Sequence, residues 1–136
     1  MPIIADNIEL QTNRDATSLR MSSVEKFADG SGYRCNLAVR SGRFTYDGPF
    51  FFDDSFVGEA IVAIQSMLTG KPGEAVLKGL WEKDSICFAM NRLGHVAVRG
   101  LLLENGGHTQ SLKFEFLTDQ TIFNQLLQDL LALHTA

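Results

Sequence analysis

The segment SLKFEFLTDQTIFNQLLQDLLALH, residues 111–134, changes its hydrophobic period part-way along. Up to residue 117, apolar and polar residues alternate, as in a strand with one buried face. From residue 122, apolar residues recur every three or four positions, as in a helix with one buried stripe: Ile122, Phe123, Leu126, Leu127, Leu130 and Leu131. A sheet face and a helix stripe must both be buried against something, so this end of the chain predicts packing of a helix on a sheet.

A second change of period occurs near the middle of the chain. The stretch DGPFFFDDS, residues 47–55, is expected to end the first run of strands, because Pro49 cannot donate a ladder hydrogen bond. Asp53 or Asp54 then fits a helix N-cap. A helical pattern covers residues 56–68, and GKPG at 70–73 ends it. The final helix is expected over 119–133, capped by Asp119 or Thr118.

Alternating segments on both sides of the first helix predict the strands. We expect them at 8–11, 19–27, 33–40, 44–46, 76–82, 86–90, 95–103 and 112–117. The turns between neighbours are short, which favours antiparallel pairing. The prediction is one α+β domain over residues 1–136. It has an antiparallel sheet of about seven or eight strands with two helices packed on it, in the order strands, helix, strands, helix.

The same patterns predict which side chains form the core. We expect burial of Leu112, Phe114, Phe116, Leu126, Leu127 and Leu130, and exposure of Lys113, Glu115, Gln125 and Gln128.

Charge and composition exclude several classes of protein. The 136 residues carry a net charge of -4, and the basic residues are scattered singly, which argues against direct nucleic-acid binding. No apolar run approaches the roughly 20 residues of a membrane span, and no signal peptide opens the sequence. Two cysteines, Cys35 and Cys87, make no disulfide framework. These features predict a cytoplasmic protein with reduced thiols.

The residue types that carry chemistry form no convergent set in the sequence. His95 is expected at a strand edge bonded to backbone, His108 in a solvated turn, and His134 at a fraying end. Cys35 falls on an apolar strand face, whereas Cys87 faces away from Ile86 and Phe88, which leaves its exposure open. The Asp53–Asp54 pair suits a cap better than acid–base catalysis. Trp81 could fill the core or anchor a ligand or partner. No metal or cofactor motif is present.

Two segments carry a family resemblance. GHVAVRGLLLE (94–104) and LKFEFLTDQTIFNQLLQDLLAL (112–133) resemble the WapI-type family of small bacterial immunity proteins and related uncharacterised bacterial proteins. In that family a Gly-His pair opens a strand, here Gly94–His95. A later alternating strand runs into an Asp-Gln-Thr helix start, here Asp119–Gln120–Thr121. The resemblance covers residues 56 to 133.

The resemblance implies a cytoplasmic α+β protein that inhibits a cognate toxin by binding it. It implies no catalytic, cofactor or metal residues. It gives Gly94, His95, Asp119 and Gln120 structural roles. Toxin-contacting residues differ with each toxin, so the sequence assigns no binding residues and no oligomeric state.

The function expected from these observations is that of a non-enzymatic immunity protein with a protein toxin as partner. An acidic inhibitor would associate faster with a basic toxin through electrostatic steering. A small-ligand-binding or accessory domain, with a pocket between sheet and helices, is the alternative. An enzyme of unknown type is the third reading.

Overall fold

The computed structural model describes residues 2–10, 17–80, 83–105 and 109–136. Its strands are β1 (Ile3–Glu9), β2 (Thr17–Lys26), β3 (Gly32–Ser41), β4 (Phe44–Asp53), β5 (Gly73–Lys78), β6 (Ser85–Met90), β7 (His95–Asn105) and β8 (Thr109–Asp119). Its helices are α1 (Asp54–Leu68) and α2 (Ile122–Thr135). Within the described residues, neither helix is long and apolar enough to cross a membrane.

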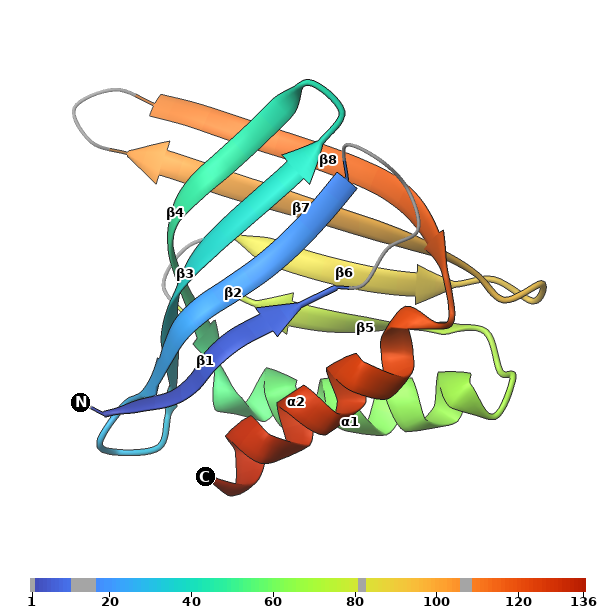
Figure 1. Ribbon diagram of the computed structural model, residues 1–136, viewed down its shortest axis with the longest axis horizontal. Helices are drawn as coiled ribbons and strands as arrows, with labels where there is room; N and C mark the ends of the chain where they lie inside the picture. Colours follow the sequence, from blue (N-terminus) through green and yellow to red (C-terminus); the bar gives the residue numbers. More distant parts are fainter. Residues whose placement is uncertain (1, 11–16, 81–82, 106–108) are drawn as a thin grey trace.

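The strands form two four-stranded antiparallel sheets, in the orders β1-β2-β3-β4 and β5-β6-β7-β8. Figure 1 shows the first sheet crossing in front of the second, with both helices along one side. The α+β class, the eight strands and the element order are confirmed. The expected single sheet is instead divided in two, because α1 carries the chain away from β4 before β5 begins.

The two sheets meet where β4 lies beside β5 and where β3 lies beside β8. Phe52 of β4 forms an isolated antiparallel bridge with Gly79, just after β5. The Leu80 amide donates to the Phe51 carbonyl at 3.1 Å. One core runs through both sheets and both helices, so the halves stabilise each other.

Strand β4 runs further than the sequence suggests. Pro49 lies within it, opposite Asn36 of β3, and the strand continues to Asp53. The expectation that the sheet ends near Pro49 is therefore wrong. A proline is tolerated there because β4 is the last strand of its sheet, so its missing N–H is needed by no further strand.

An aspartate that accepts a hydrogen bond from the amide two residues further on precedes both helices. Asp53 is the N-cap of α1 and accepts a hydrogen bond from the Ser55 amide at 2.7 Å. Asp119 accepts one from the Thr121 amide at 2.9 Å. Helix α2, however, begins only at Ile122, so the expected start at residue 119 is early by one turn. The N-cap of α2 is Thr121, so the expected caps Asp119 and Thr118 are both wrong. Asp119 instead closes the turn that leads into the helix.

The predicted core is largely confirmed. Phe114, Phe116, Leu126 and Leu130 are buried, Leu112 and Leu127 are partly buried against the core, and Lys113, Glu115, Gln125 and Gln128 are exposed. Leu131 is 37% exposed, so it does not belong to the buried stripe. The stripe of α2 chiefly contacts α1 and β1 rather than the strand that precedes it.

Candidate functional site: the outer face of the second sheet

Side chains on β5 to β8 alternate between the core and solvent. The inward ones include Leu77, Phe88, Val98 and Phe116. We call the opposite side of this sheet the outer face. Its side chains belong to Glu74, Val76, Lys78, Ser85, Cys87, Ala89, Ala97, Arg99, Leu101, Leu103, Ser111, Lys113, Glu115 and Leu117.

The outer faces of the two sheets differ in chemistry. On the central strands of the first sheet the outward residues are mainly polar or charged: Ser18, Arg20, Ser22, Arg34, Asn36, Ala38 and Arg40. On the central strands of the second sheet they are mainly apolar: Ser85, Cys87, Ala89, Ala97, Arg99, Leu101 and Leu103. An antiparallel sheet with one solvated face normally alternates apolar-in and polar-out, and the second sheet departs from that rule.

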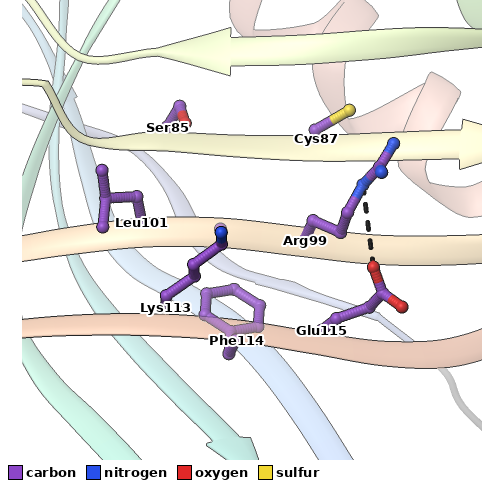
Figure 2. Close-up of a pocket in the computed structure, with 8 residues that line it drawn as sticks. Ser85, Cys87, Arg99, Leu101, Lys113, Phe114 and Glu115 are labelled. Atoms are coloured by element: carbon purple, nitrogen blue, oxygen red, sulfur yellow. Dashed lines mark ion pairs between the residues drawn. The ribbon is translucent and has the colours of Figure 1, made fainter.

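Small side chains on the central strands produce a trough along the outer face. One hollow, of about 410 Å³, includes Ser85, Cys87, Leu101 and Lys113 in its lining. A second, of about 320 Å³, includes Ala89, Ala97 and Leu117. Arg99 and Glu115 line both hollows, so the two are adjacent. Figure 2 shows the first hollow spread over β6, β7 and β8.

Arg99 is the charged centre of the trough. Its guanidinium lies 3.8 Å from the Glu74 carboxylate and 3.9 Å from the Glu115 carboxylate. These long, half-exposed contacts contribute little to stability. They place one carboxylate on each side of the guanidinium, so the three groups together carry a net charge of −1.

Cys87 lies beside this charged centre, opposite Arg99 in the β6–β7 register. Its Sγ is 3.7 Å from the Glu74 carboxylate. Burial raises the pKa of the Cys87 thiol, and the Glu74 charge raises it further, while Arg99 opposes both. The thiol is therefore protonated near neutral pH, which is the unreactive form.

A glycine supports the floor of the trough. A Cβ at Gly100 would stand 2.3 Å from Phe114 Cε1 and 3.1 Å from the Ser85 carbonyl oxygen. The Phe114 ring therefore lies directly over the Gly100 backbone, an arrangement in which a cross-strand aromatic covers a glycine. Any larger residue at position 100 would push the aromatic ring out of place.

The two short signatures of the family resemblance meet at one end of the outer face. His95 and Asp119 are cross-strand partners in the β7–β8 pair. A Cβ at Gly94, which has φ of +81°, would lie 3.5 Å from the Gln120 side chain. Segments expected to be separate motifs thus form one corner, next to the hollow that His95 lines.

The turn before His95 is fixed by Asn91 rather than by the imidazole. The Asn91 side-chain oxygen accepts the His95 amide at 3.1 Å, and the His95 carbonyl accepts the Asn91 amide at 3.0 Å. The His95 side chain is exposed. His95 is the first residue of β7, as expected, but its hydrogen bonds are made by the backbone rather than by the side chain.

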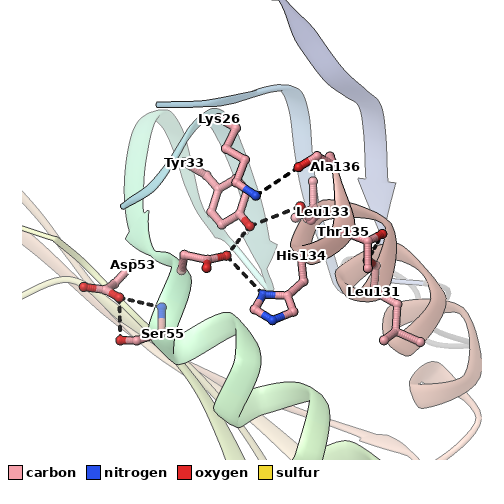
Figure 3. Close-up of polar contacts among 10 residues, drawn as sticks. Lys26, Tyr33, Asp53, Ser55, Leu131, Leu133, His134, Thr135 and Ala136 are labelled. Carbon is pink, nitrogen blue, oxygen red and sulfur yellow. Dashed lines mark hydrogen bonds and ion pairs between the residues drawn. The ribbon is translucent and has the colours of Figure 1, made fainter. Parts of the chain in front are cut away.

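His134 does not fray, contrary to expectation. It lies within α2, and its Nδ1 is 3.2 Å from the Asp54 carboxylate at the start of α1 (Figure 3). The Tyr33 hydroxyl donates to the same carboxylate and lies 3.2 Å from the Leu133 carbonyl. The other side of the His134 ring faces Gly58 on α1. These contacts fasten the end of α2 to the start of α1.

The remaining candidates have structural positions. Asp53 is a helix cap, as expected. Cys35 is buried, and burial raises the pKa of its thiol to about 12. Trp81 and His108 lie outside the described residues. Among the described residues, no group of three or more His, Cys, Asp or Glu side chains is placed to hold a metal ion.

No protein-family model matches the chain, and no curated protein matches it significantly.

Sequence reasoning did not single out Arg99 or the trough. The sequence did carry a sign of an apolar outer face. In β6 and β7 both the inward and the outward positions are mostly apolar or small. The search for catalytic residue types passed over it, since Ala, Leu and a single Arg carry no reaction chemistry.

Proposed function

We propose that the chain is a non-enzymatic, cytoplasmic immunity protein that neutralises a cognate bacterial toxin by binding it directly. The observation that carries this proposal is the outer face of the second sheet, which exposes an apolar trough around one oriented arginine. Exposed apolar surface of this kind is typical of protein contact sites, and arginine is enriched among the residues that dominate interfaces.

Two assays test the proposal: a growth assay of cells that express the toxin, and a binding assay with the two purified proteins. The toxin would be the product of a toxin gene adjoining the gene for this chain. We expect that co-expression of the chain protects cells from that toxin, and that the two purified proteins form a stable complex. His95→Ala should keep protection wherever the variant remains folded, because binding is spread over a surface and depends on no catalytic histidine. Turnover of a small substrate, lost on one conservative substitution, would contradict the proposal.

A small-ligand-binding domain is the second candidate. The hollow of about 410 Å³ falls in the size range of ligand pockets. This hollow is lined by residues of β6, β7 and β8, so the ligand site would lie on the sheet rather than between sheet and helices. Saturable binding of a small molecule that shifts signals only from the outer face would favour this candidate.

A further inference from the structure

We draw no further inference here: the strongest candidate, the cleft of about 290 Å³ that Tyr46 and Asp47 of β4, Glu104 of β7 and Asp84 line together, rests on a cluster of acidic side chains, and among the residues that the structure describes no buried side-chain polar atom left without a hydrogen-bond partner points to a ligand there.

Discussion

Single buried side chains hold the two helices to the sheets. Leu126 and Leu130 are almost completely buried on the inward side of α2, whereas Leu131, the neighbour of Leu130, is 37% exposed. Tyr33 of β3 is buried, and its hydroxyl lies between the start of α1 and the end of α2. There it contacts the Asp54 carboxylate of α1 and the Leu133 carbonyl of α2. The apolar contacts of Leu126 and the polar contacts of Tyr33 can therefore be tested separately.

Truncation of Leu126 should be costly. Leu126→Ala removes a side chain that is 1% exposed, and such changes lower the free energy of unfolding by about 2–5 kcal/mol. Leu131→Ala is the matched control from the same helix and should cost less than about 1 kcal/mol. Urea unfolding measures both. Similar losses for the two variants would mean that the stripe of α2 does not face the core as described.

The Tyr33 phenol should make stability depend on alkaline pH. Burial raises the pKa of Tyr33 well above its usual range, and the hydrogen bond to Asp54 and the charge of Asp54 raise it further. The unfolded chain ionises this group near pH 10, whereas the folded chain keeps it protonated. Its contribution to stability is therefore present below about pH 10 and declines as the pH rises beyond that value.

Tyr33→Phe isolates this effect. The variant should lose about 1–3 kcal/mol near pH 7, because it removes the single hydroxyl proton that the Asp54 carboxylate and the Leu133 carbonyl share. The difference in unfolding free energy between parent and variant, measured by urea titration, should shrink above about pH 10. Taking this difference removes the titration of groups common to both proteins, including Cys35. A difference that stays constant to pH 11 would contradict the assignment.

At the scale of elements, the sequence predicted what local patterns encode. The changes of period located both helices, and Asp53, one of the two expected caps, is the N-cap of α1. The N-cap of α2 is Thr121 rather than Asp119 or Thr118. The division into two sheets depends on which strands pair after a helix intervenes, and no local alternation encodes it. The length of β4 was underestimated because the tolerance for Pro49 depends on β4 being an edge strand, a property of the assembled sheet.

The candidate site was harder to predict than the fold. Arg99, Ala97 and Leu101 form a trough only because β7 pairs with β6 and β8 in a particular register. The outer face is recognisable by comparison with the first sheet, and that comparison requires knowing which side of each strand is buried. The contact between His134 and Asp54 joins residues that are 80 positions apart in the chain. It forms only because the two helices lie against each other.

The β7–β8 pair yields an element-scale prediction. Gly100→Ala would place a methyl group against the Phe114 ring and the Ser85 carbonyl, so we expect a loss of about 1–3 kcal/mol through overpacking. Gly73→Ala on β5 is the control, because its nearest neighbour would be Met67 Cγ at an ordinary 3.8 Å. That variant should be neutral or more stable by up to about 1 kcal/mol, since alanine has less freedom in the unfolded chain. Denaturant unfolding of both variants is the measurement, and equal effects would contradict the close contact at Gly100.

At the scale of the whole molecule, the two halves repeat one order, four antiparallel strands followed by a helix, yet their outer faces differ. The first sheet presents Arg20, Arg34 and Arg40 to solvent, and the second presents the trough. The net charge of -4 belongs to the molecule as a whole and acts at long range. The apolar side chains of the trough act only on contact, because they carry no charge. Long-range charge and short-range apolar contact should therefore control different steps of binding.

Salt separates these two steps. For a basic toxin, raising the salt concentration from about 0.05 M to 0.5 M should slow association, because the attraction between exposed charges is screened beyond about 10 Å at 0.1 M and beyond shorter distances at higher salt. Dissociation should change much less, since apolar contacts are not screened. Stopped-flow association and displacement kinetics with the toxin measure the two rate constants. If salt acts mainly on dissociation, exposed ion pairs rather than apolar contacts hold the complex together.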